Sequence, residues 1–250
     1  MDEKLWYHHW FNSPFYHQLY FERDEREAEA FINQLVQHLN IPQGSRVLDA
    51  ACGRGRHSQF LAAAGFKVTG IDIASDNIAY AKKSIAPEAD NPEFFIHDMR
   101  LPLRGNYFDY ILNLFTSFGY FRTRREHDDT IRTIAKSLRP SSYFIIDYLN
   151  VHFAESHLIH HETKIIGNTH YDIHRWDDEN SFFKKMMITD PSLKSPMEIT
   201  DVVAKFSLGD FTDMLSYQGL QVQEVFGSYK LDSYHISDQP RLIIVAKKSE

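Results

Sequence analysis

The segment Val47–Gly55, which reads VLDAACGRG, decides the fold of this chain. Residues 46–50 form a short apolar run with Asp49 near its end, which is typical of a buried strand. Two glycines follow, and a helical pattern starts at about His57. In an open parallel sheet, ligands bind outside the carboxyl ends of the strands, where such a turn lies. Because glycine lets the backbone approach a bulky group closely, the segment predicts a strand followed by a ligand-binding turn and a helix.

The residues on both sides repeat this arrangement of strand and helix. Continuous apolar runs predict further strands at 67–72, 94–97, 108–114 and 143–148. Apolar spacing of three and four residues predicts helices over residues 24–39, 57–64, 75–84 and 124–138, with Asp24 capping the first. Apolar strands that alternate with helices indicate a parallel sheet covered on both faces. The predicted fold class is therefore α/β, with a doubly wound, mainly parallel sheet of the Rossmann-like type.

The alternation of strands and helices breaks after Asn150. Alternating polar and apolar residues between 160 and 206, separated by turn residues, predict an antiparallel hairpin or small sheet. We expect residues 151–206 to be an insertion that acts as a lid. A helix at 207–218 and two strands, at 220–229 and 242–247, then complete the main domain.

Composition limits the class of protein. The chain has 250 residues, 43% of them hydrophobic and 24% charged, which fits a single globular domain over residues 1–250. A net charge of -7 argues against a uniformly basic nucleic-acid-binding surface. The single cysteine, Cys52, cannot form an intramolecular disulfide, which favours a cytoplasmic location. The sequence contains neither a signal-peptide pattern nor an apolar run long enough to span a membrane.

The first 21 residues are unusually aromatic. Residues 1–21 contain two tryptophans, three tyrosines and three phenylalanines, the last of which is Phe21. A segment of this composition should fold back onto the rest of the protein. Two readings stay open: an N-terminal arm that only packs against the domain, and an aromatic cover over a bound ligand. In the second reading, the arm and residues 151–206 together form the lid.

Carboxylates end three successive predicted strands. They belong to Asp49, Asp72 and Asp98. Asp72 is suited to accept hydrogen bonds from ribose hydroxyls, and Asp98 from an adenine amino group. This set fits a nucleoside with a cationic tail and fits a pyrophosphate poorly. The dinucleotide fingerprint is also incomplete, because Ser58 occupies its third glycine position, and no P-loop occurs.

With these acidic strand ends, the glycine turn resembles the first motif of the class I S-adenosylmethionine-dependent methyltransferases. The resemblance covers residues 44–150 well and residues 207–250 in overall pattern. It implies a seven-stranded sheet whose last strand is antiparallel to the rest, and S-adenosyl-L-methionine as the cofactor. The variant Cys52–His57 is typical of a subgroup that methylates small molecules. The cofactor-binding residues expected are Asp49, Ala51, Gly53, Gly55, His57, Asp72, Ile73, Asp98, Met99, Asn113 and Phe115.

The segment Asn113–Phe121 lies where enzymes that methylate DNA amines or protein glutamine carry an Asn/Asp-Pro-Pro-Tyr motif. That motif is absent, which disfavours those substrates. The aromatic residues present instead suggest a wall between cofactor and acceptor, although burial in the core is the alternative. The candidate acceptor-binding residues are Tyr16, Tyr20, Phe118, Tyr120 and Arg241. No residue is assigned a catalytic role.

Histidines on one predicted strand need a separate interpretation. His170, Asp172 and His174 alternate, so they share one face of an extended strand. A metal or substrate site is one reading, and a solvated face is the other and the preferred one. No metal is assigned.

The predicted function is methyl transfer from S-adenosyl-L-methionine to a small-molecule acceptor by in-line displacement. Two alternatives remain: a non-catalytic protein that binds the same cofactor, and, less favoured by the acidic charge, an RNA methyltransferase. Neither a membrane nor a nucleic acid is expected as a partner. The sequence leaves a homodimer open.

Overall fold

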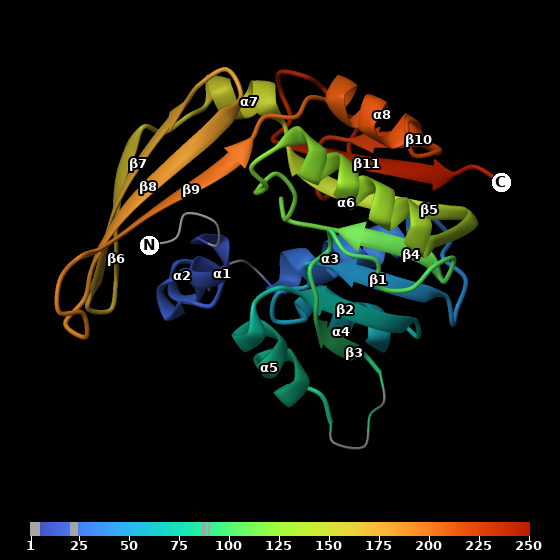
Figure 1. Ribbon diagram of the computed structural model, residues 1–250, viewed down its shortest axis with the longest axis horizontal. Helices are drawn as coiled ribbons and strands as arrows, with labels where there is room; N and C mark the ends of the chain where they lie inside the picture. The colour runs from blue at the N-terminus through green and yellow to red at the C-terminus, as the bar shows by residue number, and fades with distance from the viewer. Residues whose placement is uncertain (1–5, 21–24, 87–88, 90) are drawn as a thin grey trace.

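The computed structural model describes residues 6–20, 25–86, 89 and 91–250 (Figure 1). The predicted cap Asp24 and, within the aromatic arm, residues 1–5 and Phe21 lie outside these ranges. The helices are α1 (Trp6–Phe11), α2 (Pro14–Leu19), α3 (Glu25–His38), α4 (Arg56–Ala63), α5 (Ser75–Lys83), α6 (Arg124–Ser137), α7 (Val151–Ser156) and α8 (Leu208–Ser216). The strands are β1 (Arg46–Ala50), β2 (Lys67–Asp72), β3 (Glu93–Ile96), β4 (Phe108–Asn113), β5 (Leu138–Leu149), β6 (His161–Ile166), β7 (Thr169–Asp177), β8 (Ser181–Thr189), β9 (Met197–Ala204), β10 (Leu220–Phe226) and β11 (Arg241–Lys248).

The main sheet has seven strands in the order β10-β11-β5-β4-β1-β2-β3. Strands β1 to β5 pair in parallel, whereas β11 runs antiparallel to both of its neighbours. The predicted α/β fold with one antiparallel last strand is confirmed. Since β1 lies between β4 and β2, the carboxyl ends of these strands and of β3 meet at one edge of the sheet.

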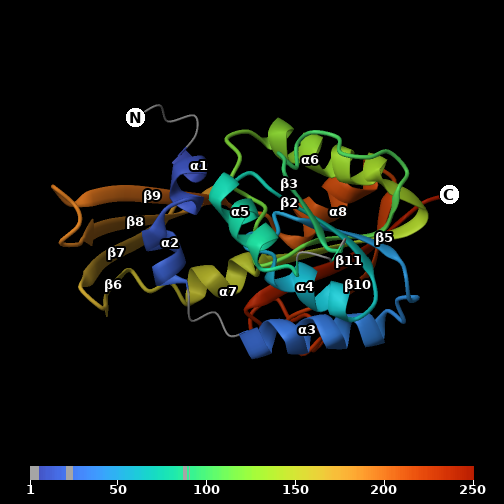
Figure 2. The same ribbon diagram turned by 90° about the horizontal axis from the view of Figure 1, so that it is seen from below.

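Helices cover both faces of the main sheet, and alternation along the strands decides which side chain meets which layer. Val47 of β1 packs with Phe31 and Leu35 of α3 on one face. The next residue, Leu48, packs with Ile131 of α6 on the other face. Figure 2 shows α3 and α4 on one side of the sheet and α6 and α8 on the other. Each such fully buried aliphatic side chain contributes about 1.5–3 kcal/mol.

The predicted antiparallel insertion is present as a second sheet of four strands. These strands follow the order β6-β7-β8-β9, and we call residues 161–204 the small sheet. All its pairings are antiparallel. Helices α1 and α2 pack on one face of it (Figure 1). Trp10 of α1 is buried there with Tyr171 and Ile173. Residues 6–20, which we call the N-terminal segment, therefore pack on the small sheet.

The structure departs from the sequence prediction in element lengths and in short helices. Helices α1, α2 and α7 have six residues each, too few to show an apolar period. Strand β5 begins at Leu138, five residues before the predicted start, in a stretch that contains Pro140. Within the described residues, no helix combines the length and the apolar character that crossing a membrane requires.

Candidate functional site

A cavity of about 520 Å³ opens at the carboxyl ends of β1, β2 and β3 and extends toward α1 and α2. Nine of the eleven predicted cofactor residues line it: Asp49, Ala51, Gly53, His57, Asp72, Ile73, Asp98, Met99 and Phe115. Gly55 and Asn113 do not line it. Side chains distant in sequence therefore meet around one space, large enough for a nucleoside with an extended tail.

The turn after β1 takes its shape from left-handed backbone conformations and one carboxylate. Ala51, Gly53 and Gly55 have φ values of 63°, 57° and 80°. The Gly53 N–H donates to Oδ2 of Asp72 at 2.8 Å, and the Ala74 N–H donates to Oδ1 at the same distance. Asp72 thus joins the turn after β1 to the turn after β2.

Gly55 serves the packing behind the cavity. A Cβ atom at this position would lie 2.5 Å from the ring of Phe94, which is itself buried. The helix α4 begins directly after Gly55, so the close approach fixes where this helix starts relative to β3.

Asp49 is a buried carboxylate at the floor of the cavity. It is 2% exposed, and the Ser58 hydroxyl donates to its Oδ2 at 2.6 Å. Burial raises the pKa of Asp49 to about 6, and the negative charge of Asp72 adds to this rise. Sequence reasoning noted Ser58 only as a missing glycine, whereas in the structure it is the partner of this carboxylate.

Asp98 is held by an arginine that follows it closely. Arg100 donates from Nη2 to Asp98 at 2.7 Å and from Nη1 to Glu126 at 2.6 Å. The same guanidinium donates to the Tyr7 hydroxyl of α1 at 3.3 Å. The carboxylate of Asp98 is thereby fixed at the cavity wall by a guanidinium that it shares with Glu126.

Asn113 lies beneath the cavity rather than at its wall. Its side chain has no exposed surface, and its amide donates to the Ala50 carbonyl at 2.9 Å. A longer contact of 3.6 Å reaches Sδ of Met99. The residue supports two lining elements and does not itself face the cavity.

A buried acid that the sequence analysis did not select holds the loop after β4. Asp147 of β5 is fully buried and accepts from the Phe115 N–H at 2.8 Å. Arg241 pairs with Asp147 at 2.6 Å and donates to the Thr116 hydroxyl at 2.9 Å. Phe115 and Thr116 have φ values of 57° and 56°, so this ion pair stabilises a left-handed loop beside the cavity. The sequence did offer a signal for this residue, because Asp147 is the one acidic residue within the apolar run 143–148.

The predicted acceptor residues divide between the cavity and the interior. Tyr16, Tyr20 and Tyr120 line the cavity. Phe118 does not, because its ring is fully buried in the core beside α6 and α8. Arg241 is outside the lining as well, since its guanidinium is committed to Asp147.

A second group that the sequence analysis missed comes from the small sheet. Asp201 of β9 lines the cavity and is 7% exposed. It pairs with Lys184 of β8 at 2.7 Å, and Lys184 also contacts the Tyr20 hydroxyl. Burial raises the pKa of Asp201, and the Lys184 ammonium opposes that rise. These residues connect the N-terminal segment, the small sheet and the cavity.

His17 of α2 also faces the cavity, and it is a neutral side chain at pH 7. Burial lowers its pKa to about 4, and the nearby Arg54 guanidinium lowers it further. An uncharged imidazole at this wall can donate or accept a hydrogen bond without adding charge to the cavity.

Comparison with known proteins agrees with this geometry. The methyltransferase domain family matches residues 47–141. The chain is 27% identical over 106 residues to dTDP-3-amino-3,4,6-trideoxy-alpha-D-glucopyranose N,N-dimethyltransferase of Streptomyces venezuelae, covering 42% of this chain and 43% of that protein. It is 31% identical over 119 residues to glycine N-methyltransferase of Rattus norvegicus, covering 42% and 40% respectively. The chain spans about half the length, or less, of the curated relatives that it matches.

The fold as a whole also has a known counterpart. A crystal structure of an S-adenosylmethionine-dependent methyltransferase from Clostridium acetobutylicum superposes with a TM-score of 0.79. That match covers 94% of this chain and 97% of the other, so it includes the region of the small sheet. At 14% identity it supports an assignment of the fold and not of the activity. Residues 47–141 therefore match a methyltransferase domain, and the chain as a whole has the fold of a solved S-adenosylmethionine-dependent methyltransferase.

Proposed function

We propose that this protein transfers a methyl group from S-adenosyl-L-methionine to a small-molecule acceptor. The observation that carries the proposal is one cavity lined both by the acidic strand ends Asp49, Asp72 and Asp98 and by the N-terminal segment. The donor set fits the cofactor: carboxylates for the ribose and the cationic tail, and a close backbone turn for the methionine part. The match of residues 47–141 to the methyltransferase domain family supports the same assignment.

The residues of the cavity have defined parts in this reaction. Asp72 binds the ribose and the 98–99 segment the adenine, while Asp49 and the turn at Gly53 bind the methionine end. When bound, the cofactor supplies an activated methyl group on a sulfonium. Transfer requires mainly that the acceptor atom be held in line with that methyl group, which the walls of the cavity do by orienting the acceptor. Phe115 and Tyr120 present aromatic rings that favour a nearby positive charge.

We propose further that the acceptor is a small amine. The acceptor end of the cavity combines the carboxylate of Asp201 with the rings of Phe11, Tyr16, Tyr20 and Tyr120. Phe11 and Tyr120 pack edge to face with centroids 5.4 Å apart, and Tyr16 and Tyr20 lie 4.9 Å apart. Carboxylate and ring faces together suit an ammonium group. Two relatives are named as N-methyltransferases of amino compounds, in line with this choice.

Asp201 then receives the proton that the reaction releases. An amine attacks only as the free base, so its ammonium form must first lose a proton. That is the only proton released: the free amine then forms the nitrogen–carbon bond while the carbon–sulfur bond breaks with its electron pair kept on sulfur, and the product is a methylated ammonium group. We assign Asp201 as the acceptor of that proton and Tyr20 as a positioning residue held by Lys184.

Calorimetry and product analysis test the activity. We expect S-adenosylmethionine and its demethylated product to bind with one site per chain, and a nicotinamide dinucleotide to give no heat. Mass spectrometry of a panel of small amines and their hydroxyl analogues should show methylation confined to amines. Cofactor binding without any methylated product across the panel would favour a non-catalytic cofactor-binding protein. Methylation of RNA in a parallel assay would favour an RNA methyltransferase.

A variant pair tests the acceptor site separately. Asp201→Asn should raise the KM for the amine by at least about tenfold, as expected for a lost charge-assisted hydrogen bond. Its affinity for the cofactor should be unchanged. Asp213→Asn, an exposed position on α8, is the matched control. An unaltered KM in Asp201→Asn would remove this residue from the acceptor site. The homodimer and the cytoplasmic location stay predictions, and light scattering in solution tests the first.

A further inference from the structure

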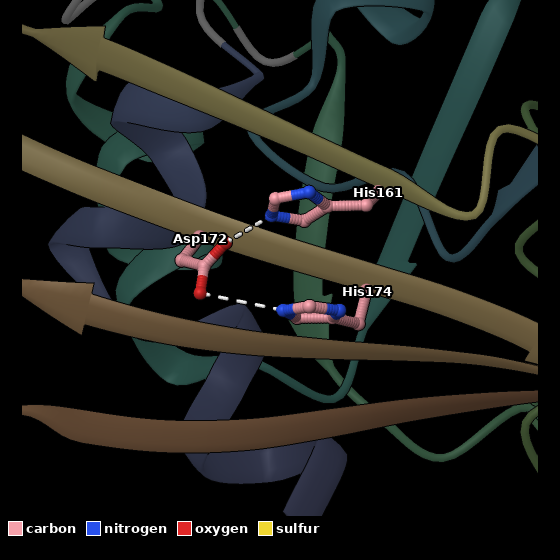
Figure 3. A group of neighbouring side chains, drawn as sticks. All are labelled: His161, Asp172 and His174. Atoms are coloured by element: carbon pink, nitrogen blue, oxygen red, sulfur yellow. Dashed lines mark hydrogen bonds and ion pairs between the residues drawn. The ribbon is translucent and has the colours of Figure 1, made fainter.

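Two histidines and an aspartate gather on the face of the small sheet that points away from α1 and α2. They are His161 of β6 and Asp172 and His174 of β7, drawn in Figure 3. Each offers one ligand atom, and these three atoms all lie within 4.8 Å of one another. The side chains are 54%, 48% and 52% exposed, so an ion from solvent can reach them.

Strand pairing brings these side chains together. In the antiparallel register of β6 and β7, His161 is directly opposite His174. Asp172 precedes His174 by two residues, so both point to the same face. The intervening Ile173 points to the opposite face, where it is buried beneath the N-terminal helices. The sequence alone could not identify His161, because the register of β6 is a tertiary property.

The predicted grouping of His170 with Asp172 and His174 is thereby revised. His170 is opposite Ile165 on β6 and Thr189 on β8, and it is not a member of the cluster. It remains an exposed histidine on the same strand.

We propose that His161, Asp172 and His174 bind a divalent transition-metal ion, with Zn²⁺ as the ion best suited to this set. Imidazole nitrogen and carboxylate oxygen are both common zinc ligands, and three protein ligands leave a fourth position for water. The site belongs to the small sheet and is independent of the proposed cofactor cavity.

The ligand atoms of the three side chains already lie near one another. Nε2 of His174 lies 3.3 Å from Oδ2 of Asp172, and Nε2 of His161 lies 2.6 Å from Oδ1. Ligand atoms around tetrahedral zinc are about 3.3 Å apart, from metal–ligand bonds of about 2.0–2.1 Å. The histidine rings stack at 4.4 Å with an interplanar angle of 18°, so both present the same edge to the carboxylate (Figure 3). Coordination therefore requires the two stacked rings to turn toward each other, so that both Nε2 lone pairs point at one ion.

Metal binding requires the protons on Nε2 of His161 and His174 to move, and this needs no change of the backbone. Each Nε2 now shares a proton with Asp172, which holds the pKa of that carboxyl below its usual value. Coordination requires the Nε2 lone pair, so in each neutral ring the proton moves to Nδ1. Both rings are half exposed, so solvent can carry that exchange.

Neighbouring charges do not oppose a cation. The nearest lysine on β8, Lys185, is opposite His174 in the register. Its ammonium pairs with Glu198 of β9 at 2.9 Å, which balances its charge. Asp172 is the acidic member of the cluster and supplies a negative charge that favours a cation.

Zinc titration of chelator-treated protein by calorimetry tests the site. We expect one Zn²⁺ per chain at this cluster and a rise in the thermal midpoint, since ligand that binds only the folded state stabilises it. His161→Gln and His174→Gln should each weaken binding at least about tenfold, the usual effect of losing a ligand or its support. His170→Gln, on the same strand, should bind like the parent.

A second readout reports coordination directly. Co²⁺ should give visible absorption bands in the parent and in His170→Gln, and these bands should be lost in the other two variants. Equal zinc affinity in all four proteins, or an equal loss in His170→Gln, would overturn the proposal. Circular dichroism of each variant confirms folding, which these exposed substitutions should leave intact.

Discussion

The backbone N–H of Gly53 and the carboxylate of Asp72 are joined by a hydrogen bond of 2.8 Å. This bond connects the turn after β1 with the end of β2, two strands that are neighbours in the sheet. The carboxylate is 8% exposed, and that exposure is toward the cavity that it lines. One side chain thus shapes the turn and remains accessible to a ligand.

Replacing Asp72 should therefore weaken cofactor binding strongly. In Asp72→Asn the ribose loses one hydrogen bond to a charged acceptor, which contributes about 1.5–3 kcal/mol, so affinity should fall by about 10- to 150-fold. Calorimetry with S-adenosylmethionine measures this, with Asp213→Asn as the exposed control. Parent-like affinity in Asp72→Asn would show that the nucleoside lies elsewhere.

Two left-handed glycines offer a matched test of packing behind the turn. Gly55 and Gly44 have φ values of 80° and 76°, but only at Gly55 would a Cβ meet Phe94, at 2.5 Å. Both alanine variants bear a backbone strain of about 1–2 kcal/mol, and Gly55→Ala also bears the steric clash. Urea denaturation should show the larger loss of stability for Gly55→Ala. Equal losses would mean that the Phe94 ring moves aside freely.

Asp49 should make the stability of the ligand-free protein depend on pH. Its folded pKa of about 6 exceeds the unfolded value, so its contribution is complete below pH of about 4 and is lost as pH rises through about 6. Relative to Asp49→Asn, the parent should lose on the order of 2–3 kcal/mol of unfolding free energy across that window. Denaturation at a series of pH values measures the difference. A parent that gains stability over the same window would contradict the assignment.

Phe118 and Tyr120 should respond to substitution in opposite ways. Phe118 is fully buried in the core, so Phe118→Ala should cost on the order of 3 kcal/mol of stability. Tyr120 lines the cavity, so Tyr120→Ala should leave stability nearly unchanged and raise the KM for the acceptor. Denaturation and steady-state kinetics on both variants separate the two roles. A large KM effect from a folded Phe118→Leu variant would restore Phe118 to the acceptor site.

The sequence by itself determined the main sheet and the strand ends. Continuous apolar runs such as 108–114 and the helical spacing of 124–138 are local patterns, and the topology of a parallel sheet brings their carboxyl ends to one edge. For this reason the sequence alone could select Asp49, Asp72 and Asp98. The local strand pattern places a residue at the end of its strand, and the parallel topology then places that end at the ligand-binding edge.

Only the tertiary structure decided which side chains outside those strand ends face the cavity. Phe118 and Tyr120 are two residues apart in one aromatic segment, yet the first is buried and the second lines the cavity. Asp201 reaches the cavity, and His161 reaches His174, through the register of the small sheet. Register depends on pairing between strands far apart along the chain, and a shift of one residue would turn these side chains to the other face.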